Sequence, residues 1–260
     1  MPMNILAERP ARTANSAAMI VLFTDFGGDG PYVGQIETVL ARDAPGTRVI
    51  GLLNDAPAYD AKRSAYLLAS LIDVFPSEAV FLCIVDPEVG GERAALVVKA
   101  DERLFVGPDN GLFEILLRRA TRRAAWTISW RPTTLSQSFH GRDLFAPVAA
   151  LIAGGEEIPG TPIDVGSIRR PEWPDDLDEI VYIDHYGNAM TGRRAATIPA
   201  TVVVEAGHER MTRATTFSEV ERGTPFWYEN SNGLVEIAVN QGRASDQLGL
   251  VTGDAITINS

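Results

Sequence analysis

The stretch MIVLFTDFGGDGPYVGQIETVL, residues 19–40, decides the fold class. Its first six residues, 19–24, form a short apolar run that predicts a buried strand. Glycines and aspartates follow, and Pro31 then stands at the favoured first position of a helix. That helix carries its apolar residues on one face, at Val33, Ile36 and Leu40. A buried strand that turns directly into an amphipathic helix is typical of α/β proteins.

The same alternation of strand and helix signals continues to about residue 155. Further strands are predicted at Arg48–Leu53, Ala79–Val85 and Ala94–Ala100, and further helices at Asp60–Ile72, Gly111–Arg119 and Leu144–Ile152. Short apolar strands separated by helices favour an α/β domain with a mostly parallel sheet. We assign residues 19–157 to this N-terminal α/β domain. Residues 1–18 are polar and alanine-rich, without the apolar segment of a signal peptide, and are predicted to be a flexible extension.

The pattern changes beyond residue 157. Residues 158–178 are rich in proline and glycine, which predicts a linker. Residues 179–260 contain short β-rich runs separated by turn residues, and no long helical period appears among them. We expect this part to be a small C-terminal all-β domain.

Composition excludes some partners and leaves others open. The chain has 260 residues and a formal net charge of −11, so it repels nucleic acid but admits a cationic small molecule. Cys83 is the single cysteine, which rules out an internal disulfide and fits a reducing cytoplasm. The longest apolar runs are strand-length and far below the roughly 18 residues of a membrane helix, so no membrane contact is predicted.

Polar side chains directly follow several of the predicted strands. They are Asp25, Asp86 with Arg93 a few residues on, Asp109 with Asn110, and His140 with Arg142 and Asp143. In open α/β sheets, ligands bind beyond the carboxyl ends of the strands, so these clusters mark an expected site. Taken singly, each aspartate could equally be a turn former or a helix cap, and Asp143 is predicted to cap the helix that follows it.

Familiar motifs for other chemistries are missing from the sequence. There is no Gly-x-Ser-x-Gly elbow, no Walker A loop and no Gly-x-Gly-x-x-Gly after the first strand. The three histidines, His140, His185 and His208, have no metal-ligand spacing. We therefore predict neither a metal nor a cofactor.

Six motifs, taken in order, resemble one known family. They are TDFG…Y, VDP-x-VG-x-x-R, GPDNG, FHGRD-x-FAP-x-AA, D-x-x-GN and NS-x-G-x-x-E-I-A-V-N, and they span almost all of the chain from Ile20 onward. This pattern is similar to the S-adenosylmethionine hydroxide adenosyltransferases, whose relatives include fluorinating and chlorinating enzymes. The resemblance implies an N-terminal α/β domain, a C-terminal β-barrel and a homotrimer whose active sites lie between subunits.

The resemblance also implies roles for individual residues. Asp86, Arg93 and His140 match the set that activates water. The substrate-binding matches are Asp25 for the ribose hydroxyls, Tyr59 as a wall of the ligand site, Asp184 for the methionine ammonium, Tyr186 and Asn188 for the adenine, and Ser231 for the methionine carboxylate.

Three positions differ from the halogenating relatives. Asn232 replaces an arginine, which leaves the partner of the methionine carboxylate open. Gly141 replaces a serine that helps to hold the halide, and Asp86 stands where those relatives have a tyrosine or similar residue. These differences favour water over halide as the nucleophile.

The expected reaction is hydrolysis of S-adenosyl-L-methionine to adenosine and L-methionine, by attack of water on the ribose C5′. Two alternatives stay open, a halide-dependent adenosyltransferase and a protein that binds S-adenosylmethionine or adenosine without turnover. The pKa of bulk water exceeds that of an ordinary aspartate by roughly 12 units, or about 16 kcal/mol, so Asp86 cannot generate free hydroxide beforehand. The proton must leave late in the reaction, and either Asp86 or His140 could receive it.

Overall fold

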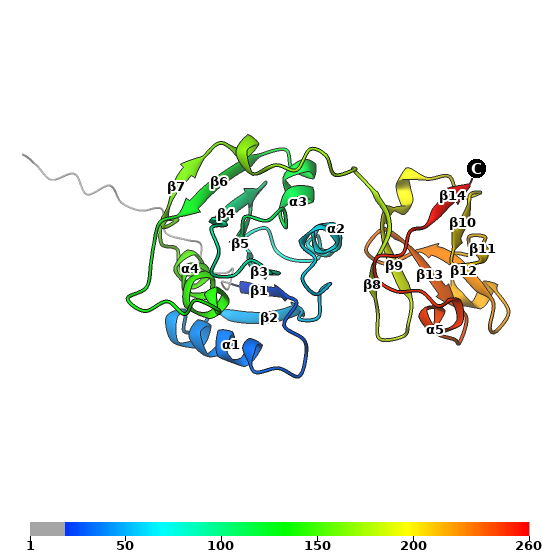
Figure 1. Cartoon of the computed structure of the whole chain (residues 1–260), viewed down its shortest axis with the longest axis horizontal. Coiled ribbons are helices and arrows are strands. Elements are labelled where there is room, and N and C mark those ends of the chain that lie inside the picture. Colours follow the sequence, from blue (N-terminus) through cyan, green and yellow to red (C-terminus); the bar gives the residue numbers. More distant parts are fainter. Residues whose placement is uncertain (1–18, 260) are drawn as a thin grey trace, which may run out of the picture.

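The computed structural model describes residues 19–259, so the extension predicted for residues 1–18 lies outside the described residues. Two parts follow one another along the chain, a larger mixed α/β part and a smaller part made mostly of strands (Figure 1). Among residues 19–259, no helix has both the length and the apolar character that crossing a membrane requires.

A seven-stranded sheet forms the centre of the N-terminal part. Its order is β2 (Arg48–Leu53), β1 (Met19–Thr24), β3 (Val80–Ile84), β5 (Arg103–Pro108), β4 (Ala95–Ala100), β6 (Arg123–Ile128) and β7 (Gly160–Ile163). The pairs from β2 to β5 are parallel, whereas β4 pairs antiparallel with both β5 and β6, and β7 pairs antiparallel with β6. Five of the seven strands therefore run in one direction, which confirms the mostly parallel sheet. The edge strand β7 lies inside the range predicted as a linker.

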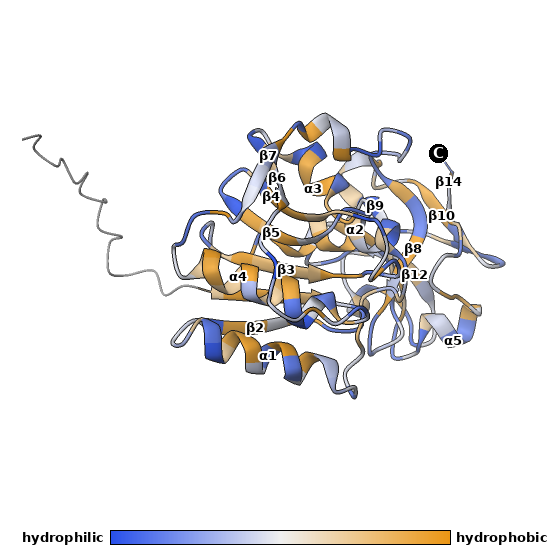
Figure 2. Ribbon diagram, turned by 60° about the vertical axis from the view of Figure 1, so that its left-hand side comes forward, coloured by the Kyte–Doolittle hydropathy of each residue, from blue (hydrophilic) through white to orange (hydrophobic). Residues whose placement is uncertain are grey.

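Helices cover both faces of this sheet. α1 (Tyr32–Asp43), the π-helical turn Gly141–Phe145 and α4 (Ala146–Ala153) share one apolar cluster with one face. α2 (Ala61–Leu71), α3 (Glu114–Arg119) and the 3₁₀ turn Val165–Ile168 share a second cluster with the other face. β1 alternates between the clusters, as the twofold period of a strand requires. Figure 2 shows the hydrophobic colouring concentrated on the central strands and on α4.

The C-terminal part consists of two antiparallel sheets. One has the order β12 (Pro225–Glu229), β13 (Leu234–Val239), β9 (Ala189–Arg194) and β8 (Leu177–Ile183), and the other β11 (Glu209–Met211), β10 (Val203–Ala206) and β14 (Thr257–Asn259). The short helix α5 (Ala244–Leu248) and the 3₁₀ turns Ala195–Thr197 and Phe217–Glu219 complete it. A shared apolar cluster packs between the sheets.

The closed β-barrel implied by the resemblance is not observed among the described residues. Two isolated bridges, Glu179 to Ala255 and Arg213 to Trp227, connect the sheet edges. Each bridge is one residue pair long, so no continuous ladder closes the sheets into a barrel. The all-β character predicted for this part is otherwise present, apart from the one turn and a half of α5.

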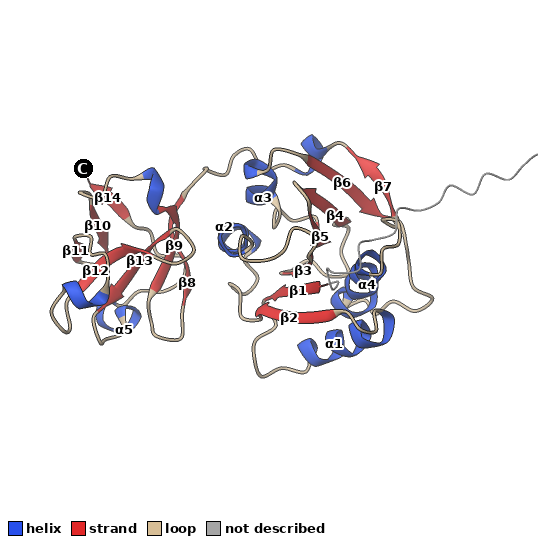
Figure 3. Cartoon of the chain, turned by 180° about the vertical axis from the view of Figure 1, so that it is seen from behind, coloured by secondary structure: helices blue, strands red, loops and turns tan. Residues whose placement is uncertain are grey.

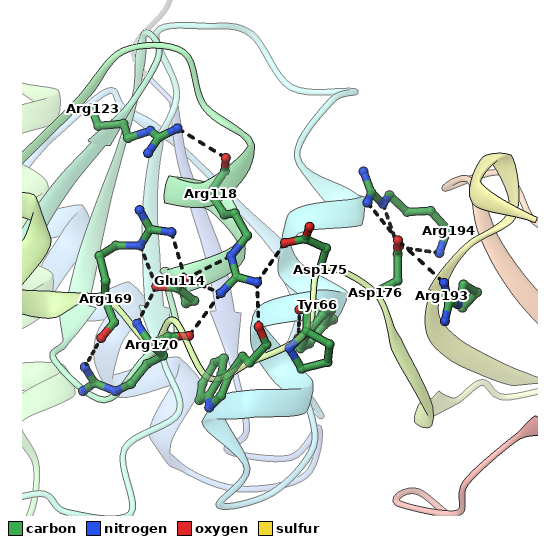
Figure 4. A network of polar contacts seen from close by, with 12 residues as sticks. Tyr66, Glu114, Arg118, Arg123, Arg169, Arg170, Asp175, Asp176, Arg193 and Arg194 are labelled. Atoms are coloured by element: carbon green, nitrogen blue, oxygen red, sulfur yellow. Dashed lines mark hydrogen bonds and ion pairs between the residues drawn. The ribbon is translucent and has the colours of Figure 1, made fainter.

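The segment between the two parts is fastened to the N-terminal helices. The buried carboxylate of Glu114 accepts hydrogen bonds from Arg118, Arg169 and the Arg170 N–H, and the Tyr66 hydroxyl donates to the Pro174 carbonyl at 2.5 Å (Figure 4). α2 packs against β8 and β9, and it lies between the large sheet and the C-terminal strands in the view of Figure 3. These contacts fix how the two parts meet.

Candidate active site

Two carboxylates lie side by side at the carboxyl edge of the parallel strands. Thr24 and Ile84 are partners at the ends of β1 and β3, so Asp25 and Asp86 follow neighbouring strand ends. The Asp25 N–H donates to the Ile84 carbonyl at 3.3 Å. A cavity of about 230 Å³, here called the Asp86 cavity, opens at this point. It is lined by Asp25, Phe26, Tyr32, Tyr59, Ile84, Asp86, Val89, Ser138, Phe139, His140 and Gly141.

Asp86, Arg93 and His140 form one hydrogen-bonded cluster at the cavity. The Arg93 Nε donates to Asp86 Oδ1 at 2.9 Å, and its Nη2 forms a second short bond to Oδ2. The same Nη2 lies 3.1 Å from His140 Nδ1. The side chains of Asp86 and Arg93 are 4% and 5% exposed, so the pair is shielded from solvent. The three residues predicted to act together are thus brought together.

Arg93 also sets the protonation state of His140. A guanidinium has only donors, so His140 Nδ1 must accept and the neutral ring carries its proton on Nε2. Burial lowers the pKa of His140 below its ordinary value, and the charge of Arg93 lowers it further. A second proton on Nδ1 would face the guanidinium, so His140 is held neutral as an N–H donor.

Asp25 is held at the cavity by a strained residue. The Tyr59 N–H donates to Asp25 Oδ2 at 3.0 Å, and Tyr59 has a φ of 62°, a left-handed conformation that is costly for a non-glycine residue. Burial raises the pKa of Asp25, although the Tyr59 N–H opposes that shift. Tyr59 is 79% exposed at the cavity rim.

An aromatic wall that the sequence did not assign closes one side of the cavity. The rings of Phe26, Tyr32 and Phe139 contact one another, with centroids 5.3 to 5.8 Å apart. Their only signal was their place inside the TDFG…Y and FHGRD motifs. Gly141 packs tightly here, because a Cβ on it would lie 3.1 Å from Ile84 and 3.2 Å from Phe139.

Two of the other strand-end clusters have structural roles. Asp143 lies inside the π-helical turn rather than capping a helix, so that prediction is wrong. Its carboxylate instead accepts from the Ser136 N–H and pairs with Arg142, which fastens the preceding loop. Asn110 donates to the Val85 carbonyl at 2.7 Å and accepts from the Leu112 N–H, so it braces the end of β3.

The predicted adenine and ammonium residues lie on the C-terminal part, around a separate hollow of about 570 Å³. This Asn188 hollow is lined by Asp184, Tyr186, Asn188, Phe217, Tyr228, Val239, Gln241, Gly242 and Arg243. The Asp184 carboxylate accepts from the Asn188 N–H at 2.8 Å and from its Nδ2 at 3.1 Å. Tyr186 is 71% exposed.

The described chain does not join all the predicted residues in one cavity. The linings of the Asp86 cavity and the Asn188 hollow share no residue. Ser231 is exposed in the β12–β13 turn and lines neither space, while Asn232 lines a groove between the two parts of the chain. Among residues 19–259, no group of three or more His, Cys, Asp or Glu side chains is placed to hold a metal ion.

Comparisons with known proteins agree over most of the chain. Residues 20–161 match the model of the SAM hydroxide adenosyltransferase N-terminal domain, and residues 178–257 match the model of its C-terminal domain. The (R)-S-adenosyl-L-methionine hydrolase of Thermus thermophilus is 37% identical over 253 residues, 90% of this chain and 96% of that protein. The protein of that name from Salinispora tropica is 37% identical over 256 residues, 91% of this chain and 96% of that protein.

Solved structures show the same similarity. The crystal structure of an uncharacterized conserved protein from Thermotoga maritima matches with a TM-score of 0.80 and 30% identity, and the match covers 93% of this chain and 100% of that one. A conserved hypothetical protein from Thermus thermophilus matches with a TM-score of 0.74 and 36% identity, over 92% of this chain and 98% of that one.

Proposed function

The chain belongs to the SAM hydroxide adenosyltransferase family, and from this premise we propose that it hydrolyses S-adenosyl-L-methionine to adenosine and L-methionine. The observation that carries the proposal is the buried Asp86–Arg93–His140 cluster at the end of β3, with the Asp25 carboxylate beside it in one cavity. A protein that only bound the ligand would not need this cluster. The relatives are named for the (R) sulfonium, and we extend that preference to this chain.

The reaction joins a water oxygen to C5′ and breaks the bond from C5′ to sulfur. The electron pair of that bond stays on sulfur, so methionine leaves as a neutral thioether and needs no general acid. The water becomes acidic only as its oxygen bonds to carbon, and a carboxylate can then accept the proton. Positioning and late proton transfer are therefore the work left to the protein.

The geometry supports Asp86 as the proton acceptor. His140 Nδ1 already accepts a hydrogen bond from Arg93, and its Nε2 carries the proton of the neutral ring. His140 would therefore donate to the water oxygen and orient it. Each oxygen of Asp86 accepts one bond from Arg93 and keeps a lone pair for the water.

We propose that a second copy of the chain completes the site, within a homotrimer. The residues for ribose and water surround the Asp86 cavity, whereas those for adenine and ammonium surround the Asn188 hollow. Tyr59 and Tyr186 leave large aromatic surfaces exposed at the two sites, as expected of faces that another subunit covers. Light scattering should give the mass of a trimer, and a fully active monomer would contradict the shared site.

Product analysis tests the function directly. S-adenosyl-L-methionine incubated with the protein, with and without chloride, should give adenosine and methionine in equal amounts and at equal rates. A 5′-halogenated nucleoside would instead indicate a halide-dependent adenosyltransferase. Tight binding with no product would indicate a protein that binds without turnover. Chiral separation of the remaining substrate should show loss of the (R) epimer.

A further inference from the structure

A buried glutamate lies on the face of a C-terminal sheet that points away from the core between the two C-terminal sheets. Glu236, in the middle of β13, is opposite Tyr228 on β12 and Met190 on β9. Its chain neighbours Val235 and Ile237 belong to the core between the two C-terminal sheets, so Glu236 points to the other face. Its residue exposure is 2%, which is unusual for a carboxylate.

The Glu236 carboxylate accepts two hydrogen bonds, one at each oxygen. The Tyr228 hydroxyl donates to Oε1 at 2.5 Å, and the Asn230 Nδ2 donates to Oε2 at 2.6 Å. A group with two acceptor oxygens satisfies both partners. A glutamine in its place keeps one acceptor oxygen and loses the charge, so one of the two partners would meet its N–H instead, and of these only the Tyr228 hydroxyl could accept it.

The second bond orients the turn that carries Ser231. With its Nδ2 facing Glu236, Asn230 presents Oδ1 to the Asn232 N–H at 2.9 Å and the Leu234 N–H at 3.0 Å. These two bonds fold the tight connection between β12 and β13, and Ser231 projects from it. Loss of the Glu236 carboxylate would free Asn230 to rotate, and the Asn232 and Leu234 N–H groups would lose the acceptor that they share.

The first bond reaches the Asn188 hollow. Tyr228 lines that hollow together with Asp184 and Asn188. No ion pair to Glu236 forms among the described residues, so both of its partners are neutral. Burial raises the pKa of Glu236, and the Asp184 charge raises it further. A buried carboxylate without a cation, beside a second carboxylate, is stabilised by a cationic ligand.

We propose that Glu236 is a positioning residue for the methionine moiety of the substrate, holding the Ser231 turn through Asn230 and facing the cationic end of the ligand through Tyr228. This inference rests on the proposed function, because it assigns the Asn188 hollow and the Ser231 turn to one ligand. The two hydrogen bonds of Glu236 go to Tyr228 and Asn230, and neither of these is a predicted adenine contact.

The test compares ligands with and without the methionine moiety. Glu236→Gln should raise the KM and the calorimetric Kd for S-adenosyl-L-methionine about tenfold, the effect of losing one hydrogen bond to a charged group. It should leave kcat and the Kd for adenosine within about twofold. Glu205→Gln, at a partly exposed glutamate that pairs with Arg210, is the matched control and should change none of these values.

A double variant reverses the polarity of the central hydrogen bond. In Glu236→Gln with Asn230→Asp, the new amide donates to the new carboxylate and still accepts from the Tyr228 hydroxyl. The new carboxylate still accepts the Asn232 and Leu234 N–H groups. We expect the Kd of the double variant for S-adenosyl-L-methionine to lie within about threefold of the wild-type value, which recovers most of the affinity lost in Glu236→Gln.

Three results would overturn this inference. Unchanged affinity in Glu236→Gln would remove the role, and an equal loss for adenosine would show a merely structural one. If the double variant bound S-adenosyl-L-methionine no better than Glu236→Gln, the proposed hydrogen bond from Asn230 to Glu236 would not be what positions the turn. If Glu236→Gln does not fold, Asn230→Ala carries the same comparison, since it frees the turn and leaves the Tyr228 bond intact. A wild-type protein that bound neither ligand would overturn the proposed function itself, and this inference with it.

Discussion

Glu114 and Asp86 are both buried carboxylates held by arginine, in the same domain, and they differ in what remains open around them. Glu114 accepts three hydrogen bonds at Oε1 and two at Oε2, from Arg118, Arg169 and the Arg170 N–H (Figure 4). Asp86 accepts one from Arg93 at each oxygen and borders a cavity. A saturated carboxylate can only hold structure, whereas one with a free lone pair beside a cavity can take part in a reaction.

The electrostatics of the two clusters follow the same difference. Burial alone would raise the pKa of Glu114, but its bonds to Arg169, the Arg170 N–H and Arg118 together hold that pKa below its ordinary value. Those bonds join α3 to the segment that leads into the C-terminal part. Around Asp86, the third member is His140, which Arg93 keeps neutral and able to donate to a ligand.

The largest expected effect is on turnover, in Asp86→Asn. The amide cannot accept a proton and would point an N–H at Arg93, so kcat should fall by about 10³-fold. Calorimetry on the same variant should show affinity for S-adenosyl-L-methionine within a few-fold of the wild type. Near-normal turnover would remove Asp86 from the chemistry.

The Glu114→Gln variant should show the converse. Two arginines would lose their buried partner, so the free energy of unfolding should fall by about 3 kcal/mol, measured by urea denaturation. Because Glu114 does not border the Asp86 cavity, kcat per folded molecule should stay within about twofold of the wild type. Asp86 accepts bonds from one arginine, whereas Glu114 accepts bonds from two arginines and a backbone N–H, so a larger stability loss in Asp86→Asn than in Glu114→Gln would reverse the comparison.

The pH dependence should report His140. Its folded pKa lies below the ordinary 6.5, so the neutral ring persists as the pH drops past that value and activity should have its acid midpoint below pH 6.5. The same shift means that the unfolded chain takes up the proton first. The contribution of the neutral His140 ring to the free energy of unfolding is therefore present above pH 6.5, and it is lost as the pH falls through the pKa of His140 in the folded protein. In His140→Asn, this pH-dependent change should disappear from both the activity and the stability measured against pH. An acid midpoint of activity above pH 6.5 in the wild type would contradict a neutral His140.

The smallest effect is expected at Gly141. A serine there would bring its Cβ to 3.1–3.3 Å from Ile84, Phe139 and Phe26, so we expect Gly141→Ser to cost about 1 kcal/mol of stability through crowding. Arg93 pairs with Asp86 and reduces the repulsion of a halide by that carboxylate. Even so, the added hydroxyl should not create a halogenated product, because the Asp86 cluster still selects water. Chromatography with added chloride checks this outcome.

The sequence predicted features that depend on local pattern or on motifs, and it missed features that depend on contacts between distant segments. The strands β1 to β4 and the helices α1 to α4 followed from the local hydrophobic pattern, whereas β6, β9 and β11 were not predicted. Asp86, Arg93 and His140 followed from the motifs that carry the family resemblance. The strand β7 was missed because its four residues, GTPI, include a glycine and a proline that indicate a linker. Glu114 and Glu236 looked like ordinary helix and strand residues, since their partners Arg169 and Asn230 come from turns whose position only the folded chain sets. The aromatic wall was missed because Phe26, Tyr32 and Phe139 come from different segments and meet only in the folded chain.

The origin of the oxygen in the product tests the central claim most directly. The reaction is run in ¹⁸O-labelled water, with and without chloride, and the adenosine and methionine are analysed by mass spectrometry. If the Asp86 cluster directs water to C5′, the 5′-hydroxyl of adenosine carries the label, methionine carries none, and chloride leaves the rate unchanged. Unlabelled adenosine, or a 5′-halogenated nucleoside as the main product, would contradict it.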